Sequence, residues 1–245
     1  MIGIFGFGRF GKLTATHLAK DFNVLVFDRT DKSSEIQKSG ARAASLSKVC
    51  RQDIVILCVP ISTLQEILKK IAPVLKKDVL VVDVCSVKEH PSQWMKDLLP
   101  ETVSILATHP MFGPDSASDS LENRKIFLSG VRIKEKLYQK IKSYLSAKGL
   151  IVVESTPKDH DEQIAVSLAL THFIGRTLSE FSAGPLNIDT EGYKRLLHIL
   201  DVVDHDTWQL FYDMHRYNPY AKEKRIAFME AMKKISDRLN DKSCV

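Results

Sequence analysis

Cysteine is scarce in this sequence, and no motif brings two cysteines together. The four that occur are Cys50, Cys58, Cys85 and Cys244. They form no Cys-x-x-Cys pair and no spacing typical of a metal site, so we expect neither a disulfide framework nor a bound metal. Cys58 lies in an apolar run, which favours a buried, reduced thiol in a cytoplasmic protein.

Long apolar runs and a strong charge excess are missing as well. No apolar run approaches the roughly 20 residues that a membrane span needs, and the N-terminus shows no signal-peptide pattern. Lys and Arg number 35 against 30 Asp and Glu, and this net charge of +5 is dispersed along the chain. So small an excess is typical of a solvated, mixed surface. We therefore expect a soluble protein with no membrane or nucleic-acid partner.

Residues 1–156 alternate short apolar runs with segments of helical periodicity. This pattern predicts strands joined by helices, and hence a Rossmann-type, doubly wound, mostly parallel sheet in an α/β domain. Strands are expected at Met1–Phe5, Val24–Phe27, Ile54–Val59, Val79–Val82, Ser104–Ala107, Ile126–Ile133 and Leu150–Val153. Helices are expected at Phe10–Lys20, Ser33–Ser39, Ser62–Lys70, Pro91–Leu99 and Lys134–Lys148.

The pattern changes after Thr156-Pro157, where strand signals end. Residues 157–245 show only helical periodicity and predict a small, all-α C-terminal domain. Four helices are expected, at Asp159–Phe181, Thr190–Val203, Asp206–Arg216 and Pro219–Leu239. Pro219 would occupy the first turn of the last helix, which a proline tolerates.

A glycine-rich motif, Gly6-Phe7-Gly8-Arg9-Phe10-Gly11, follows the first expected strand and opens the first expected helix. Its glycines allow a tight turn and a close approach of the backbone to a pyrophosphate, which the helix N-terminus attracts. Asp28 ends the second strand 22 residues after Gly6, where an acidic side chain accepts hydrogen bonds from the adenosine ribose. Its charge favours NAD, whereas Arg29 could pair with a 2′-phosphate and leaves NADP open.

Two further segments follow strands directly. Asp83-Val84-Cys85-Ser86-Val87-Lys88 lies at the carboxyl edge of the expected sheet, where ligands of open α/β folds bind. In the simplest interpretation Ser86 only caps the next helix. The second segment, Thr108-His109-Pro110-Met111-Phe112-Gly113-Pro114, places His109 in a loop before a proline. A catalytic role and a structural loop histidine are both compatible with that position.

Taken together, these segments resemble prephenate and arogenate dehydrogenases. The resemblance continues through Thr171-His172 and Gly192-Tyr193 to Tyr217-Asn218-Pro219-Tyr220-Ala221, and it covers nearly the whole chain in the family's order. The specific part is the His-Pro run with the upstream Ser-Val-Lys. Within the family the sequence is most similar to the plant-type arogenate branch, which shares the Ser-Val-Lys-Glu and Thr-His segments.

The resemblance implies an NAD(P)-dependent oxidoreductase of tyrosine biosynthesis. Such enzymes remove a hydride from C4 of prephenate or arogenate while the ring carboxylate leaves as CO₂. His109 would bind the 4-hydroxyl and take its proton, and Ser86 would orient the hydroxyl, the nicotinamide and His109. Residues expected at the cofactor are Gly6, Phe7, Gly8, Arg9, Phe10, Gly11, Asp28, Arg29, Val59, Pro60 and Ser86.

Binding of the anionic substrate needs cations, which the family takes from an arginine of the helical domain. Lys194 and Arg195 lie near the expected position, and for each of them taken alone a solvated helix face is the simpler interpretation. His172 is a candidate for the substrate pocket or a buried helix histidine. Asp119 matches the position where the arogenate-specific branch carries an aspartate, and Asp115 is the neighbouring alternative. By analogy the helical domain would also form a homodimer.

Two other classes of function stay open at this point. Hydroxyacid and imine reductases of the same clan share the nucleotide-binding half and a helical tail, but they use a lysine of that tail as proton donor. The His-Pro run would then have no role. A non-catalytic, NAD-sensing module is the other alternative, and the intact pair of Ser86 and His109 argues against it.

Overall fold

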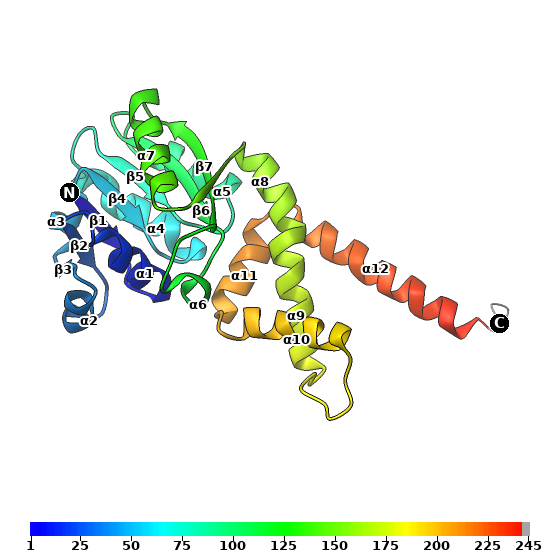
Figure 1. Cartoon of the computed structure of the whole chain (residues 1–245). Helices are drawn as coiled ribbons and strands as arrows, with labels where there is room; N and C mark the ends of the chain where they lie inside the picture. Colours follow the sequence, from blue (N-terminus) through cyan, green and yellow to red (C-terminus); the bar gives the residue numbers. More distant parts are fainter. Residues whose placement is uncertain (242–245) are drawn as a thin grey trace. The chain divides into compact units, whose positions relative to one another are not determined.

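The computed structural model describes residues 1–241, apart from the side chains of residues 202 and 204 (Figure 1). The chain divides into two compact units, Met1–His160 and Asp161–Val245. The division falls inside α8 (Pro157–Ile164), a few residues beyond the expected boundary after residue 156. Cys244 lies outside the described residues. None of the helices in residues 1–241 combines the length and the apolar character of a membrane span.

The first unit is built on one sheet of eight strands in the order β3-β2-β1-β4-β5-β6-β7-β8. The strands are β1 (Ile2–Phe5), β2 (Val24–Phe27), β3 (Arg42–Ala43), β4 (Ile54–Leu57), β5 (Leu80–Asp83), β6 (Ser104–Pro110), β7 (Lys125–Arg132) and β8 (Ile151–Glu154). All neighbours pair in parallel except β6 and β7. The expected doubly wound, mostly parallel sheet is confirmed.

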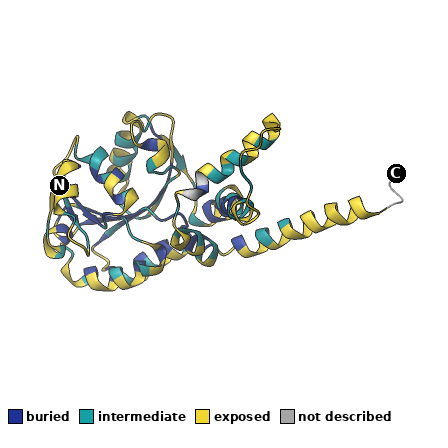
Figure 2. Ribbon diagram, turned by 90° about the horizontal axis from the view of Figure 1, so that it is seen from below, coloured by how far each residue is buried: buried dark blue, intermediate teal, exposed yellow. Residues whose placement is uncertain are grey.

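Helices connect the parallel strands and bury both faces of the sheet (Figure 2). The longer ones are α1 (Arg9–Leu18), α2 (Ser33–Lys38), α4 (Ile61–Ile71), α5 (Glu89–Leu98) and α7 (Glu135–Ala147). One face, which carries Ile4 and Val26, packs against α1, α2 and the segment around α7. Phe5, Val55 and Leu57 have the alternate register and are buried on the opposite face. Burial on both faces explains the continuous apolar runs of these strands.

Several elements differ from the sequence prediction. Periodicity did not predict β3, α3 (Leu46–Cys50), the turn at Ala72–Val74 or α6 (Pro114–Ala117), because segments this short carry no repeat. The expected strand Ser104–Ala107 was too short. β6 continues to Pro110 because it pairs with antiparallel β7, where His109 lies opposite Phe127. His109 is therefore part of a strand end, and its expected place in a loop was wrong.

The second unit contains only helices. α8 continues through a π-helical segment, η2 (Ala165–Leu170), into α9 (Thr171–Glu180). The remaining helices are α10 (Glu191–Asp204), α11 (Trp208–Tyr217) and α12 (Ala221–Asn240). Pro219 lies before α12 and not in its first turn, because Oδ1 of Asn218 accepts hydrogen bonds from the backbone N–H groups of Tyr220 and Ala221 at 2.9 and 3.1 Å. The helix thus begins two residues later than expected.

α9 and α10 approach each other closely at Gly175. A methyl group added there would lie 2.7 and 2.9 Å from the two γ-carbons of Val203, and 3.2 Å from Cγ2 of Ile199. Val203 is fully buried, and a β-branched side chain in a helix has one strongly preferred rotamer. The packing of these two helices therefore requires a glycine, which has no side chain, at position 175.

Gly175→Ala should lower the free energy of unfolding by about 1–3 kcal/mol, because overpacking exceeds the roughly 1 kcal/mol that alanine gains in helix propensity. Gly192→Ala in α10 is the matched control, since a methyl group there meets only Oγ1 of Thr190, at 3.8 Å. Urea denaturation of both variants measures the difference. Equal free energies of unfolding for Gly175→Ala and Gly192→Ala would show that α9 and α10 can move apart without loss of stability.

Candidate active site

The expected functional residues of the first unit gather at the carboxyl edge of the sheet. β1 has β2 on one side and β4 on the other, so the strand order reverses between β1 and β4. Such a switch point is where open α/β sheets bind their ligands. The glycine motif follows β1, Asp28 follows β2, Ser86 follows β5, and His109 lies at the end of β6.

The glycine motif has two glycines that packing requires and one that faces open space. Gly6 has φ of +98°, and a side chain on it would collide with the carbonyl oxygen of Cys58. A side chain on Gly11 would collide with the carbonyl oxygen of Gly6. Nothing lies within 4 Å of the corresponding position on Gly8, which precedes the first residue of α1, Arg9. This arrangement suits a pyrophosphate that approaches the backbone and the helix N-terminus.

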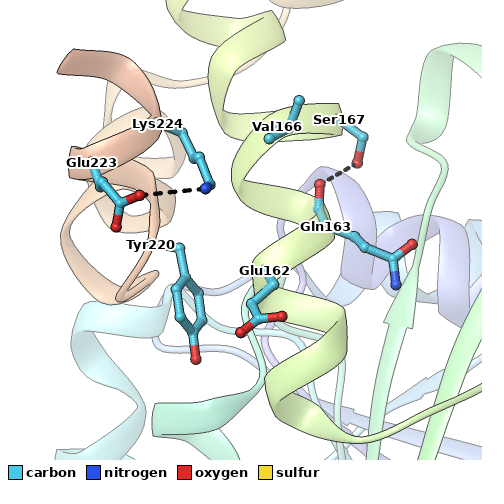
Figure 3. Close-up of a pocket in the computed structure, with 7 residues that line it drawn as sticks. All are labelled: Glu162, Gln163, Val166, Ser167, Tyr220, Glu223 and Lys224. Carbon is cyan, nitrogen blue, oxygen red and sulfur yellow. Dashed lines mark hydrogen bonds and ion pairs between the residues drawn. The ribbon is translucent and has the colours of Figure 1, made fainter. Parts of the chain in front are cut away.

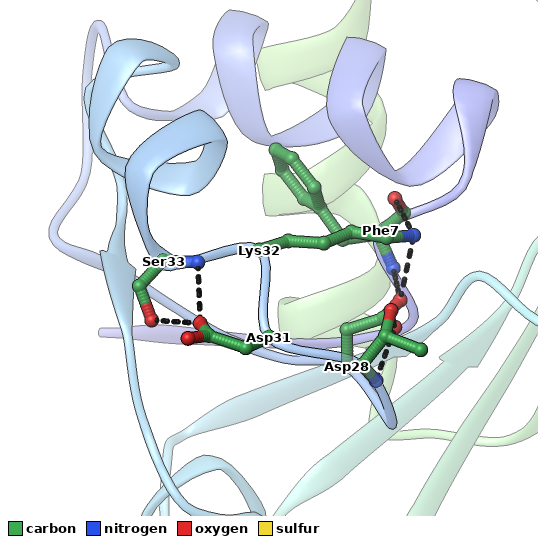
Figure 4. Close-up of polar contacts among 6 residues, drawn as sticks. Phe7, Asp28, Asp31, Lys32 and Ser33 are labelled. Carbon is green, nitrogen blue, oxygen red and sulfur yellow. Dashed lines mark hydrogen bonds and ion pairs between the residues drawn. The ribbon is translucent and has the colours of Figure 1, made fainter.

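Asp28 is tied to the glycine motif (Figure 4). Its Oδ2 accepts a hydrogen bond from the backbone N–H of Phe7 at 2.7 Å, and its Oδ1 accepts from Thr30. Although burial acts in the opposite direction, hydrogen bonds from Thr30 and Phe7 and the charge of Lys32 lower the pKa of Asp28. The carboxylate is therefore ionised at neutral pH. It borders a cavity of about 170 Å³ that Arg29 also lines, a place that fits an adenosine ribose.

Val59 and Pro60 follow β4 at the same edge. Pro60 is the N-cap of α4, and Val59 lies beneath Gly6, with its Cγ1 3.2 Å from where a Gly6 side chain would begin. Arg9, in contrast, is engaged within the unit. It donates to Oδ1 and Oδ2 of Asp115 in α6 at 2.6 and 2.7 Å. Asp115, the alternative substrate selector, is thus the partner of a residue expected at the cofactor.

A buried ion pair fixes the ends of β5 and β6. Lys88 donates hydrogen bonds to Oδ2 of Asp83 and to the carbonyl oxygen of Thr108, and the side chains of Asp83 and Lys88 are 0% exposed. Oγ1 of Thr108 in turn donates to the carbonyl oxygen of Asp83 at 2.6 Å. These bonds lock the turn that carries Ser86 to the strand that carries His109.

Ser86 does not cap a helix, and this interpretation of its role was wrong. α5 begins at Glu89 with Lys88 as its N-cap. The Ser86 side chain is largely buried, and its hydroxyl has no hydrogen-bond partner among the described residues. Buried hydroxyls normally have a hydrogen-bond partner. A buried hydroxyl without one, at the ligand-binding edge of the sheet, is suited to contact a bound cofactor or substrate.

His109 is buried and pairs with a second histidine. Its Nδ1 lies 2.9 Å from Nε2 of His160, which is in α8. Burial lowers the pKa of His109 well below its usual value, and the neighbouring His160 and Lys88 act in the same direction. The imidazole is therefore neutral at physiological pH and can accept a proton. Sequence reasoning missed His160, because nothing in the segment Pro157–Ile164 shows that it meets β6.

Asp119 and the cations expected in α10 are exposed. Asp119 follows α6 in the first unit. Lys194 points to solvent and pairs with Glu191 at 3.0 Å and with Asp189 at 3.6 Å. Arg195 is exposed on the same helix. The structure does not gather these side chains into a site within either unit.

His172, in α9, is buried. Its Nε2 lies 3.7 Å from Oδ2 of Asp206, and its Nδ1 has no hydrogen-bond partner among the described residues. Burial and the nearby Arg176 lower the pKa of His172 to about 4, so its imidazole is neutral. Arg176 donates to the carbonyl oxygen of Asp206 and stacks on Trp208, with its guanidinium carbon 4.5 Å from the ring centroid.

The helical unit also has an open groove of about 760 Å³ (Figure 3). The residues that line it are Glu162, Gln163, Val166, Ser167, Tyr220, Glu223 and Lys224. None of them is an expected site residue. The groove has two carboxylates and a single lysine, Lys224, whose Nζ lies 3.4 Å from Oε1 of Glu223. This balance of charge does not suit an anionic substrate. No group of His, Cys, Asp or Glu within residues 1–241 has the arrangement of a metal site.

Comparison with known proteins identifies the family. Residues 23–154 match the model of the prephenate dehydrogenase nucleotide-binding domain. The chain belongs to the prephenate dehydrogenase family. Residues 177–244 match a second model, described as the TYRAAT1-like C-terminal domain.

Relatives within the prephenate dehydrogenase family include arogenate dehydrogenases. The chain is 34% identical to chloroplastic arogenate dehydrogenase 1 of Arabidopsis thaliana over 97% of its own length, and it spans 39% of that protein. It is 32% identical to arogenate dehydrogenase 2 of the same plant, over 98% of this chain and 71% of the relative. A probable arogenate/prephenate dehydrogenase of Methanocaldococcus jannaschii is 30% identical over 95% and 55% of the two chains.

Solved structures of this family share the fold. Prephenate dehydrogenase of A. aeolicus, solved with hydroxyphenyl propionate and NAD⁺, matches with a TM-score of 0.77 at 22% identity, over 99% of this chain and 92% of that one. Arogenate dehydrogenase of Synechocystis matches with a TM-score of 0.73 at 20% identity, over 98% and 91%. Both cover the sheet and the helical tail, so the expected two-part architecture is confirmed.

Proposed function

We propose that the chain catalyses the oxidative decarboxylation of arogenate to tyrosine, and of prephenate to 4-hydroxyphenylpyruvate, in tyrosine biosynthesis. The observation that carries the proposal is the neutral, buried His109 at the edge of a dinucleotide-binding sheet. Membership of the prephenate dehydrogenase family supports the reaction type. The Arabidopsis relatives, which are named arogenate dehydrogenases, support the substrate.

His109 acts as the base in this reaction. The proton of the substrate's 4-hydroxyl moves to the imidazole as the hydride leaves C4, and the C4–O bond gains carbonyl character. The bond between the ring and its carboxylate then breaks and releases CO₂. Its electron pair makes the ring aromatic, and the oxygen takes the proton back from His109. A positioned base of this kind contributes about 10²–10⁴-fold to the rate.

Ser86 orients the reacting groups. Its unpartnered hydroxyl can donate to the substrate oxygen and accept from a neighbouring group, which fixes C4 relative to the cofactor. NAD, when bound, accepts the hydride. The glycine motif would hold its pyrophosphate, and the ionised Asp28 its adenosine ribose. Because Asp28 would repel a 2′-phosphate, NAD is the proposed cofactor in preference to NADP.

A homodimer formed by the helical unit is part of the proposal. Large apolar side chains recur every three or four residues along α12 and are between 40% and 83% exposed. They are Ile226, Met229, Met232, Ile235 and Leu239. An exposed apolar surface of this extent is typical of a protein–protein contact, and a second copy of the chain is the occupant that the family analogy suggests.

The nucleotide preference tests the role of Asp28. Wild-type kcat/KM should be higher with NAD than with NADP. Asp28→Ser should lower the ratio of kcat/KM with NAD to kcat/KM with NADP by about 10- to 100-fold, because a charged hydrogen bond to the ribose is lost. Asp97→Ser is the control, because Asp97 is exposed in α5, accepts from Gln93 of the same helix and does not line the cavity beside Asp28. A wild-type preference for NADP would assign the nucleotide choice to Arg29. No turnover with either nucleotide and either substrate would indicate a non-catalytic module.

His109→Asn tests the base. We expect kcat to fall by about 10²–10⁴-fold, with NADH affinity in a fluorescence titration nearly unchanged. Ser86→Ala should be milder, since the serine orients groups and transfers no proton. In the wild type, kcat/KM should fall as acid protonates His109, at a pH well below 6.5 because the pKa of His109 is lowered. Near-wild-type turnover by His109→Asn would remove the residue from the mechanism.

The choice between the two substrates tests Asp119. Arogenate carries an ammonium group where prephenate has a ketone, so a carboxylate at that end of the site favours arogenate. We expect wild type to prefer arogenate and Asp119→Asn to shift the kcat/KM ratio toward prephenate by about tenfold. Asp206→Asn is the comparison, because it alters the carboxylate beside His172. A wild-type preference for prephenate, or an unchanged ratio in Asp119→Asn, would exclude Asp119 as the selector.

A further inference from the structure

We infer that His160 is a positioning residue for the proposed reaction. His160 accepts a hydrogen bond from Nδ1 of His109, which leaves Nε2 of His109 to take the substrate's proton. The inference rests on the proposed function of His109. It adds a second histidine to the site and gives it a defined task, which is to select one tautomer and one orientation of the base.

The geometry of the pair is that of a directed hydrogen bond. The two nitrogens are 2.9 Å apart, and the rings meet edge to face, with centroids separated by 5.1 Å and planes inclined by 76°. Both side chains are more than nine-tenths buried. Phe127 of β7 packs against His160 with a centroid distance of 4.4 Å, and its own backbone lies opposite His109 in the sheet. Neither ring can turn freely.

The protonation of a neutral imidazole decides whether it can act as a base. One ring nitrogen carries hydrogen and the other has a lone pair, and the partner of one nitrogen fixes the state of the other. If Nδ1 of His109 donates to His160, the lone pair is on Nε2, which can then take the substrate's proton. If His160 donates instead, Nε2 of His109 carries hydrogen and cannot take a proton. The reaction requires the first arrangement.

The pair also acts on the charge that forms during the reaction. When Nε2 takes the hydroxyl proton, His109 becomes a cation in a buried place near Lys88, whose positive charge opposes it. A neutral His160 that accepts from Nδ1 stabilises this cation, as the orienting acid does in a catalytic triad. Asp83 pairs with Lys88 through Oδ2, and its Oδ1 accepts from the backbone N–H of Thr108, the residue before His109. On α8 itself, Lys158, Asp159 and Glu162 are exposed, and Asp161, which follows His160, is fully buried. Phe127 carries no charge.

Two substitutions separate this role from packing. His160→Leu removes the acceptor and keeps a buried side chain, whereas His160→Gln keeps an oxygen that can accept from Nδ1. For His160→Leu we expect kcat to fall by about 10- to 100-fold, the value of a lost hydrogen bond to a charged group, with KM and NADH affinity within about twofold of wild type. The acidic limb of kcat/KM should move to lower pH, because an imidazolium without its acceptor loses its proton more readily. His160→Gln should restore most of both properties.

A measurement that needs no turnover follows the same pair. Ring ¹⁵N chemical shifts in the NADH-bound protein should show His109 protonated on Nδ1 in wild type, and a tautomer mixture in His160→Leu. An unmoved acidic limb with equal losses in the two variants would overturn the inference, as would a wild-type His109 protonated on Nε2. If the wild type oxidised neither substrate, the proposed function would fail, while the nitrogen shifts would still decide whether His160 orients His109.

Discussion

The side chain of Lys88 is fully buried, so protein groups have to balance its charge. The arrangement of the site follows from that requirement. An unpaired buried ammonium would cost several kcal/mol, so Lys88 is met by the carboxylate of Asp83 and the carbonyl oxygen of Thr108. Asp83 ends β5, and Thr108 directly precedes His109 on β6. Satisfying this one ion therefore sets the spacing of two strand ends and the turn between β5 and α5.

The same charge determines the chemistry of the histidine. A buried lysine close to His109 opposes a second positive charge, and burial acts in the same direction, so the imidazole stays neutral. The lysine of the Ser-Val-Lys segment is paired with Asp83 and is fully buried. It acts on the site as a fixed positive charge that tunes the base, and the unpartnered Ser86 hydroxyl is the member of the segment that can meet a ligand.

Repeating patterns made much of the fold predictable. Apolar runs located seven of the eight strands, and the glycine motif with Asp28 located the nucleotide end of the sheet. Residues whose role depends on a distant partner were not predictable. β6 reaches His109 only because β7 pairs with it, and the contact of His160 with His109 joins residues 51 positions apart. The unbroken periodicity of Asp159–Phe181 likewise gave no sign of the π-helical segment.

The helical unit shows why proximity in sequence is a poor guide to a substrate-binding cation. Lys194 follows Tyr193, but helix geometry turns it outward, where Asp189 and Glu191 cancel its charge. Among the described residues, the hydrogen bonds of Arg176 and Arg225 involve no carboxylate. Arg176 stacks on Trp208, and Arg225 bonds to His215 and lies over Phe173. A guanidinium held by a ring and a neutral acceptor keeps both its charge and its direction, and binding a carboxylate depends on these two properties.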